Sequence, residues 1–378
     1  MGSVGIETAR GFVPPTTHRA IIAEAGDRIL IREDTPLAPL QSHEFLVRTE
    51  ALSLNPSDTK MRGAFVTPGA MLGADYAGTV VARGAGVTAV AIGDRVCGAQ
   101  YEMNAKRPFR AAFGQYNIPT GPFWLKLPPS VSTEGGATMS AAIGTAGLAL
   151  DRLGLPLPDA PVTKPAHVLV YGGGTATATI AIQLLKLINM IPITACSPVH
   201  NERLKSYGVE ATFDYHEPDC ASQIKSYTRN NLRYALDCIS TVESTTLCFA
   251  ALGRAGGKYV SLDPFDTAVA ATRAVVKTDW VLGPSLYGEG CVWPPPYARA
   301  PSAEDLALGE RLWAIAQRLL DEDRLRHHPL RTLEGGLEEV LVGMDMVRKG
   351  ELRGEKGGHT GSFTGVYCLK FHGKQRET

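Results

Sequence analysis

A chain of 378 residues is longer than a single hydrophobic core usually organises, so its length predicts two domains. Hydrophobic residues make up 44% of the chain and charged residues 20%, which is ordinary globular composition rather than that of a disordered or membrane protein. Lysine plus arginine equals aspartate plus glutamate at 38 each. With no net field to attract nucleic acid or an anionic membrane, polyanion binding is disfavoured as the main role.

The cysteines and the absence of apolar runs indicate a reducing compartment. An odd number of cysteines without a CxxC pair does not suggest a disulfide framework. Residues 1–17 carry Glu7 and Arg10 and lack the apolar core of a signal peptide, and no apolar run approaches the roughly 20 residues that span a bilayer. We therefore expect a cytosolic, cytoplasmic protein. The cysteines are Cys97, Cys196, Cys220, Cys238, Cys248, Cys291 and Cys368.

Short strands separated by turns are predicted from about residue 19 to residue 129. Residues 44–54 and 75–82 have strand-like composition, and turn formers follow each of them. This region predicts a β-rich, partly open barrel. The proline-rich stretch 156–165 then predicts a linker.

The pattern changes at Ala166. Residues 167–171 are apolar without alternation, as expected for a strand buried on both faces, and residues 178–187 then follow a helical period. Strands that alternate with helices predict right-handed crossovers and a doubly wound parallel sheet of the α/β class. Further strands of this sheet are predicted at 191–196, 234–239, 258–262 and 279–282.

A long helix is predicted after the parallel sheet. Ser302 and Asp305 have the spacing of a capping box before an apolar helical face that begins at Leu308. We expect this last segment to return and pack on the first domain. The predicted division is 1–165 for the first part of the β-rich domain, 166–300 for the parallel-sheet domain and 301–378 for the C-terminal return.

The turn between the first strand and the first helix of the parallel sheet is the candidate cofactor loop. It reads Gly-Gly-Gly-Thr-Ala-Thr-Ala over residues 172–178. Glycine lets the backbone approach a pyrophosphate, and the helix N-terminus adds favourable partial charge. The strict GxGxxG pattern is absent, but Thr175 and Thr177 can donate hydroxyl hydrogen bonds to phosphate. A glycine-rich turn without a ligand is the alternative, and the strand–turn–helix context favours dinucleotide binding.

The end of the second parallel strand favours NADPH over NADH. NAD binders usually carry an acidic residue there for the ribose hydroxyls, and residues 195–200 contain no carboxylate that would repel a 2′-phosphate. Ser197 can donate to this phosphate, and Arg203, Lys205 and Tyr215 lie close in sequence. The alternative is that these side chains are solvated surface groups.

A zinc site cannot be assembled from the spacing of the cysteines and histidines. Residues 54–60 stand where metal-binding dehydrogenases carry a zinc cysteine, and residues 72–78 lack their histidine. Alcohol oxidation is therefore disfavoured. Conjugate reduction needs only hydride at a β-carbon, an enolate held by hydrogen bonds and a proton at the α-carbon.

Several longer motifs carry a resemblance to one family. They lie at 55–63, 98–100, 170–179, 231–239, 282–284, 288–290, 327–330 and 347–352. Together they resemble the trans-acting enoyl reductases, separate proteins that serve fungal iterative, highly reducing polyketide synthases, and the likeness covers about residues 12–356. The resemblance implies a zinc-free medium-chain dehydrogenase/reductase fold, with a GroES-like catalytic domain plus a Rossmann domain. It also implies NADPH reduction of an α,β-unsaturated polyketide thioester on the synthase's acyl carrier domain.

The resemblance further implies the site residues, with no metal ligand among them. The implied catalytic residues are Lys60, near the enolate or its proton, and Thr145, at the junction of cofactor and substrate. The implied cofactor-binding residues are Ser57, Asp58, Thr59, Lys60, Gly174, Thr175, Ala176, Thr177, Ser197, Pro198, Val199, His200, Tyr215, Leu262, Asp263, Leu352 and Arg353. The implied substrate-binding residues are Thr145, Ala146, Gly147, Leu148, Ala149, Leu150, Asp151, Arg152, Gly283, Pro284, Ser285, Leu286 and Tyr287.

Structural alternatives stay open for several of these residues. Lys60 alone can be a surface lysine, Asp58 can cap a turn, and Thr145 can simply start its helix. His327 and His328 resemble an interdomain packing pair more than ligands.

Two features depart from the family pattern. Residues 357–365 intervene before the hydrophobic segment 366–371. We therefore expect the strand that closes the first domain to be displaced, loosely held or missing. A Trp-Pro-Pro-Pro-Tyr stretch at 293–297 follows the last strand of the parallel sheet, the edge through which relatives often dimerise. Proline lacks a ladder donor and blunts such edges, so the chain is predicted to be a monomer.

Two other functions stay open at this point. A free-standing quinone or alkenal reductase would share the fold and the cofactor, and only the long motifs favour the polyketide role over it. A non-catalytic structural or nucleic-acid-binding member of the fold is the second alternative, and the zero net charge weighs against nucleic acid.

Overall fold

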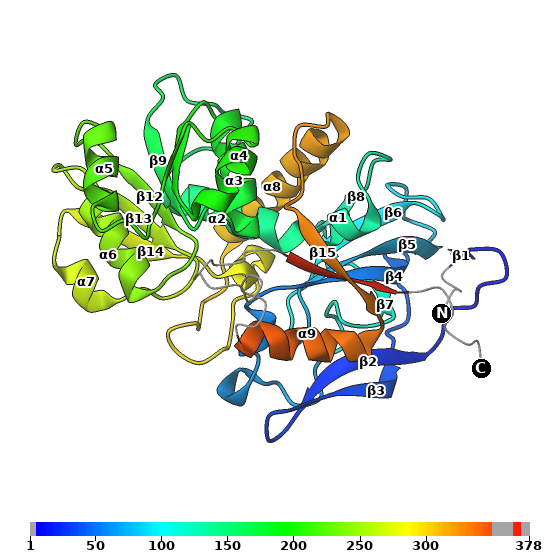
Figure 1. The fold of residues 1–378 in the computed structure, drawn as a ribbon. Helices are drawn as coiled ribbons and strands as arrows, with labels where there is room; N and C mark the ends of the chain where they lie inside the picture. Colours follow the sequence, from blue (N-terminus) through cyan, green and yellow to red (C-terminus); the bar gives the residue numbers. More distant parts are fainter. Residues whose placement is uncertain (1–4, 350–365, 372–378) are drawn as a thin grey trace.

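The computed structural model describes residues 5–349 and 366–371, and two sheets organise it (Figure 1). The first sheet is mixed, in the order β15-β16-β4-β5-β6-β8, with β1 paired to β5 and β7 paired to β4. A separate hairpin, β2–β3, completes this half. The strands are β1 (Ile6–Thr8), β2 (Thr17–Glu24), β3 (Arg28–Pro36), β4 (Phe45–Leu54), β5 (Asp75–Gly84), β6 (Arg95–Ala99), β7 (Tyr116–Asn117), β8 (Trp124–Lys126), β15 (Leu330–Gly335) and β16 (Val366–Phe371).

The second sheet is parallel throughout, in the order β11-β10-β9-β12-β13-β14. It confirms the predicted doubly wound sheet. The strand order reverses between β9 and β12, and ligands of such sheets bind outside the carboxyl ends of the strands at this point. Its strands are β9 (His167–Tyr171), β10 (Ile191–Ala195), β11 (Ala211–Phe213), β12 (Tyr234–Asp237), β13 (Gly257–Ser261) and β14 (Val276–Trp280).

Helices join and cover the two sheets. The α-helices are α1 (Thr133–Ala137), α2 (Ser140–Arg152), α3 (Ala176–Leu187), α4 (Asn201–Ser206), α5 (Cys220–Tyr227), α6 (Val242–Ala251), α7 (Thr267–Ala271), α8 (Ala303–Asp321) and α9 (Leu337–Lys349). Four short 3₁₀ helices are described: η1 (Asp58–Lys60), η2 (Gly63–Phe65), η3 (Pro198–His200) and η4 (Gly283–Tyr287).

Helix α2 lies between the two sheets (Figure 1). It packs against α3, β13 and β14 on one side, against β6 on the other, and against α8. Two glycines permit this approach, because a Cβ on Gly147 would lie 2.2 Å from Leu312 Cδ2 and one on Gly144 would lie 2.9 Å from Trp313 Cη2. One continuous hydrophobic core therefore includes residues from both sheets.

Two predicted element boundaries can be compared with the structure, the start of α8 and the extent of β14. The Ser302 side chain accepts a hydrogen bond from the Asp305 N–H at 3.0 Å, so the predicted N-cap of α8 is present. Strand β14 spans Val276–Trp280, whereas the sequence predicted a strand at 279–282. Residues 277–279 are exposed at the edge of the sheet, so an apolar pattern did not reveal them.

The closing strand of the first sheet is present, although the sequence raised doubt about it. β16 pairs parallel with β15 and antiparallel with β4, in which Leu369 lies opposite Leu52. Cys368 and Leu369 are fully buried in two hydrophobic clusters. Burial of alternate sheet faces fixes the register of the strand despite the departure at 357–365.

No helix in residues 5–349 or 366–371 is long and apolar enough to cross a membrane.

The contribution of this closing strand to the free energy of unfolding can be tested by shortening one of its buried side chains. Leu369→Ala should destabilise the protein by about 2–5 kcal/mol, because it removes a fully buried side chain and leaves a cavity. The neighbouring Lys370→Ala is the control and should cost about 0–1 kcal/mol, since Lys370 is exposed and its ion pair with Glu134 lies at the surface. Urea unfolding of both variants measures the difference, and equal values would show that the strand does not close the core.

Candidate active site

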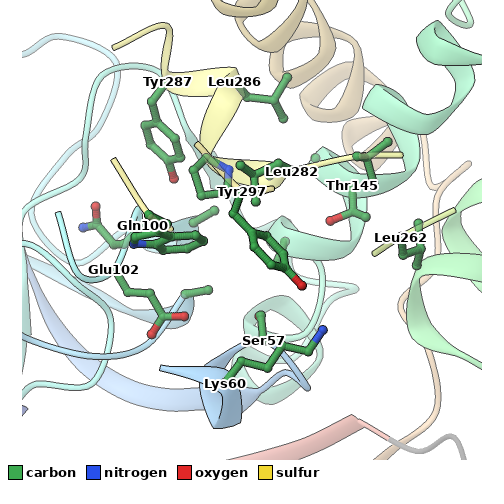
Figure 2. A pocket seen from close by; sticks show the side chains of 18 of the residues that line it. Ser57, Lys60, Gln100, Glu102, Thr145, Leu262, Leu282, Leu286, Tyr287 and Tyr297 are labelled. Carbon is green, nitrogen blue, oxygen red and sulfur yellow. The ribbon is translucent and has the colours of Figure 1, made fainter. Parts of the chain in front are cut away.

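A cavity lies between the two sheets, at the carboxyl end of the parallel strands (Figure 2). Its walls come from η1, the loop after β6, α2, the segments after β13 and β14, and η4. Most of the lining is apolar, as suits a ligand with an aliphatic portion. The apolar side chains include Met61, Phe65, Leu262, Trp280, Val281, Leu282, Leu286, Tyr287, Trp293 and Trp313.

A small polar group lies at one side of this cavity. The ammonium of Lys60, in η1, forms an ion pair with the carboxylate of Asp263, in the loop after β13. The Tyr297 hydroxyl donates to the other oxygen of Asp263 at 2.8 Å. Thr145 of α2 also lines the cavity. The two predicted catalytic side chains, Lys60 and Thr145, therefore lie in one pocket (Figure 2). The predicted cofactor residue Asp263 lines the same pocket.

The glycine turn after β9 forms a second, smaller pocket. Gly172 has φ +77°, a conformation that favours glycine, and a Cβ on Gly173 would lie 2.2 Å from Thr194 Oγ1. Thr175 caps α3 by accepting the Ala178 N–H at 3.2 Å. Glycine is needed at these two positions because a Cβ would not fit in the turn. The lining of the pocket includes Tyr171, Gly172, Gly174, Ser197, His200 and Tyr215.

A half-buried arginine stands beside this second pocket. One terminal nitrogen of Arg203 lies 3.1 Å from His200 Nδ1, while its Nε is buried without a hydrogen-bond partner in the described structure. No ion pair joins Arg203 to a carboxylate among the described residues. Burial lowers the pKa of Arg203, as expected for a guanidinium whose desolvation no carboxylate compensates. These groups fit a phosphate-bearing dinucleotide.

Three buried carboxyl groups lie next to the main cavity. Asn55 ties two of them together: its N–H donates to Asp58 Oδ2 at 2.6 Å and its side-chain amide donates to Asp75 Oδ2 at 2.9 Å. Glu102, which lines the cavity, accepts the Gly73 N–H at 2.7 Å. Burial raises the pKa of Asp75 to about 7. Burial also raises the pKa values of Asp58 and Glu102, and the nearby carboxyl groups of Glu102 and Asp75 raise the pKa of Asp58 further.

The structure brings together many of the predicted site residues. Those that line the main cavity are Ser57, Lys60, Thr145, Leu262, Asp263, Gly283, Pro284, Leu286 and Tyr287. Those that line the second pocket are Gly174, Ser197, His200 and Tyr215. Among the remaining predicted cofactor residues, Thr175, Ala176 and Thr177 continue the glycine turn into α3, Pro198 and Val199 are exposed in η3, and Thr59 is half-buried.

Other predicted residues lie away from the cavity. Residues 146–150 are buried where α2 packs in the core, and Arg152 forms ion pairs with Asp151 and Asp305, so none of these residues is part of the cavity lining. Ser285 is buried outside that lining as well. The Asp58 side chain is fully buried, which leaves only its backbone for a cofactor contact. Leu352 and Arg353 lie outside the described residues.

Sequence reasoning missed several residues of the cavity. Glu102, Trp280, Trp293 and Tyr297 all line it, and the Trp293–Tyr297 stretch had been interpreted only as cover for a sheet edge. Tyr297 instead packs edge-on against Trp280, with ring centroids 5.3 Å apart. The cluster of aromatic residues after β14 is the sequence feature that could have indicated these cavity residues. No group of three His, Cys, Asp or Glu side chains arranged to hold a metal is found in the described part of the chain.

The fold and the cavity define the class of protein. Residues 41–125 match the family model described as the alcohol dehydrogenase GroES-like domain. Similar solved structures include the CurK enoyl reductase (TM-score 0.71, 15% identity) and the quinone oxidoreductase from Coxiella burnetii (TM-score 0.64, 20% identity). Each comparison covers 94% of this chain and 99% of the other. The chain thus has the medium-chain dehydrogenase/reductase fold, and the predicted GroES-like plus Rossmann fold is confirmed.

Relatives with higher sequence identity show to which family the chain belongs. The enoyl reductase component lovC of the lovastatin nonaketide synthase from Aspergillus terreus is 53% identical over 351 residues, which cover 91% of this chain and 96% of the relative. Dehydrogenase mokE from Monascus pilosus is 52% identical, covering 91% and 97%, and trans-enoyl reductase FSL5 from Gibberella zeae is 44% identical, covering 90% and 96%. The chain belongs to the trans-enoyl reductase family, which confirms the resemblance seen in its motifs, and it is an enoyl reductase.

Asp75 gives a pH-dependent prediction. An ordinary carboxyl ionises near pH 3.9, so between about pH 4 and about 7 the folded state keeps a proton that the unfolded state loses, and Asp75 destabilises the fold increasingly as pH rises. Asp75→Asn cannot ionise. Its free energy of unfolding, relative to the wild type, should therefore increase with pH by at most about 1.4 kcal/mol per unit in this window.

The same variant also loses one acceptor, for the Asn55 amide or the Ala141 N–H, at a cost that does not vary with pH. Urea unfolding at several pH values separates the two contributions. A difference that stays constant with pH would contradict a protonated Asp75 in the folded protein.

Proposed function

We propose that this enoyl reductase uses NADPH to reduce the α,β-double bond of an acyl thioester carried on the acyl carrier domain of an iterative, highly reducing polyketide synthase. The observation that carries the proposal is the apolar cavity that has Lys60 and Thr145 in its wall and lies at the ends of the parallel strands. An aliphatic acyl chain suits the apolar walls, and the polar side chains suit its thioester. Relatives named as trans-enoyl reductases and as a synthase component support the partner.

The residues of the cavity would have different roles in the reaction. The nicotinamide, when bound, would supply hydride for the β-carbon. The Lys60 ammonium and the Thr145 hydroxyl would donate hydrogen bonds to the thioester oxygen, where negative charge develops as the enolate forms. The aromatic and aliphatic walls would hold the acyl chain and exclude water. Ser57, Leu262 and Asp263 border the same space and would contact the nicotinamide half of the cofactor.

The choice of NADPH rests on the second pocket. Arg203 brings a half-buried positive charge without a carboxylate partner among the described residues, and Ser197 and Tyr215 lie 3.2 Å apart at their hydroxyls. A 2′-phosphate would supply the missing counter-charge to Arg203 and accept from Ser197. No acidic side chain in residues 195–200 would repel it.

The proposal also covers the location, the oligomeric state, the domain boundaries and the partners of the enzyme. We place the enzyme in the cytoplasm as a monomer, with domains at 1–165, 166–300 and 301–378, where the last segment completes the catalytic domain. Partners would be the acyl carrier domain, in a synthase with or without a fused peptide synthetase, and the enoyl thioester. Neither nucleic acid nor membrane is part of the proposal.

A substrate comparison tests the function. NADPH oxidation should be fast with a crotonyl or α-methylcrotonyl thioester on a pantetheine carrier and slow with a simple quinone. The apolar cavity has room for a chain, and a carrier-bound thioester presents the carbonyl that Lys60 and Thr145 would polarise. Quinone turnover with an inert thioester would instead support a detoxifying quinone or alkenal reductase.

The cofactor assignment has its own test. Arg203→Ala should weaken NADPH binding about 10- to 100-fold and leave NADH binding unchanged, because a charge-assisted hydrogen bond contributes about 1.5–3 kcal/mol. Lys205→Ala is the matched control and should change neither, since Lys205 is exposed and already paired with Glu202. Fluorescence titration with both nucleotides measures this, and equal losses for both would refute a 2′-phosphate contact.

A further inference from the structure

The Asp263 carboxylate joins three segments that lie far apart in the sequence. Asp263 follows β13, and one of its oxygens pairs with the ammonium of Lys60 in η1. Its other oxygen accepts a hydrogen bond from the hydroxyl of Tyr297, in the segment between η4 and α8, at 2.8 Å. All three residues line the main cavity, and Figure 2 shows the Lys60 ammonium and the Tyr297 hydroxyl pointing toward one another.

Other contacts hold the tyrosine and the carboxylate in place. The Tyr297 ring lies edge-on to Trp280 of β14, with ring centroids 5.3 Å apart, and edge-on to Phe65 of η2, with centroids 5.1 Å apart. The Ser261 hydroxyl donates to the main-chain carbonyl of Asp263 at 2.6 Å. Burial and the Asp263 carboxylate raise the pKa of Tyr297, so its phenol stays a hydrogen-bond donor. The orientation of the carboxylate is therefore fixed by contacts other than its ion pair.

The Lys60 ammonium depends on this carboxylate for its position. Lysine carries its charge on a flexible chain of four carbons, and 44% of the Lys60 side chain is exposed. Ion pairs at such exposed sites are weak, because the cost of ordering two flexible side chains offsets much of their attraction. A carboxylate that Tyr297 has already ordered lowers this cost, so the hydrogen bond from Tyr297 narrows the range of positions that the ammonium occupies.

The ion pair leaves Lys60 able to act on a substrate. An ammonium has three N–H donors, and the hydrogen bond to Asp263 uses one of them. The other two are available to an oxygen in the cavity. Lys60 can therefore be held by Asp263 and donate to a thioester oxygen at the same time.

We propose that Tyr297 is a positioning residue for the reduction, which acts through Asp263 to hold the Lys60 ammonium where the thioester oxygen becomes negative. The inference rests on the proposed enoyl reductase function, in which Lys60 donates to that oxygen. Tyr297 itself is assigned no contact with the reacting atoms, because its hydroxyl donates to Asp263. Such a residue can still govern the rate, since a misplacement of about 1 Å at a reacting group can cost about 100-fold.

The first test removes only the hydroxyl of Tyr297. Tyr297→Phe keeps the ring that packs on Trp280 and Phe65. It loses the donor to Asp263. The rate of thioester reduction in a single turnover should fall about 5- to 50-fold, while the dissociation constant of NADPH should change less than about twofold. A rate within about twofold of the wild type would overturn the proposal, and so would weaker NADPH binding at an unchanged rate.

Tyr227→Phe is the matched control for the loss of a hydroxyl. The Tyr227 hydroxyl also donates to a carboxylate, that of Glu210 at 2.9 Å, but this pair is exposed at the end of α5 and is not part of the cavity lining. The control variant should keep the wild-type rate and the wild-type affinity for NADPH. Equal losses of rate in the two variants would show a general effect of removing a hydroxyl and contradict the assignment of Tyr297.

A double-mutant cycle distinguishes positioning from a structural role. Once Lys60→Met has removed the ammonium, Tyr297→Phe should change the single-turnover rate less than about twofold further. Asp263→Asn combined with Tyr297→Phe should likewise be no slower than Asp263→Asn alone. A purely structural role for Tyr297 would give the same fold loss in every background, which would refute the route through Asp263. If Tyr297→Phe does not fold, independent losses from Asp263→Asn and Lys60→Met would refute the same route.

The stereochemistry of the product tests whether Tyr297 instead supplies the proton. With an α-methyl enoyl thioester in D₂O, the wild type should place deuterium on one face of the α-carbon. Tyr297→Phe should be slower and still label that face alone, because positioning of the ammonium does not determine which group protonates the carbon. Both epimers from this variant would make Tyr297 the proton donor and overturn its role as a positioning residue.

The outcomes also separate this inference from the proposed function. A wild type that leaves every enoyl thioester unreduced would refute the function itself. An active wild type with an equally active Tyr297→Phe would refute only the inference and leave the enoyl reductase function intact.

Discussion

The close packing of α2 against α8 is the constraint on which the active site depends. Gly144 and Gly147 have no side chain to separate the helices, so Trp313 and Leu312 approach the backbone of α2 directly. This contact holds the parallel sheet and the mixed sheet around one core. It also fixes Thr145, which lies between the two glycines in the sequence, in the wall of the cavity. A wider separation of the helices would remove the cavity's wall rather than merely loosen the core.

The cavity combines an apolar lining with charges that are compensated in different ways. Lys60 and Asp263 neutralise one another across the space between the sheets. Asp58, Asp75 and Glu102 have no such partner in the described residues. Backbone and amide donors to these carboxyl groups favour the ionised forms, but burial outweighs them and raises the pKa values. The result is a largely apolar site in which the Lys60 ammonium and the Thr145 hydroxyl would be available to a developing enolate. In such a site each hydrogen bond to the developing charge is stronger than it would be in water.

Local signals predicted the parts of the fold that depend on neighbouring residues. The unalternating apolar run at 167–171, the glycine turn after it and the helical period that follows gave β9, the turn and α3. The Ser302 cap also followed from adjacent residues. Local signals failed at β14, whose exposed pattern at the sheet edge resembles a loop. They also left β16 in doubt, because this strand is held by its pairing with β15 and β4, which lie far from it in the sequence.

By itself, the sequence determined the family, the doubly wound sheet, the glycine loop and the polar residues Lys60 and Thr145, because these are encoded in contiguous motifs. Only the tertiary structure decided what surrounds them. Glu102, Trp280 and Tyr297 come from three separate segments, and no local pattern marks their convergence on one cavity. The same is true of the raised pKa values of Asp75 and Glu102, because proton affinity depends on burial and on neighbours that only the fold brings together.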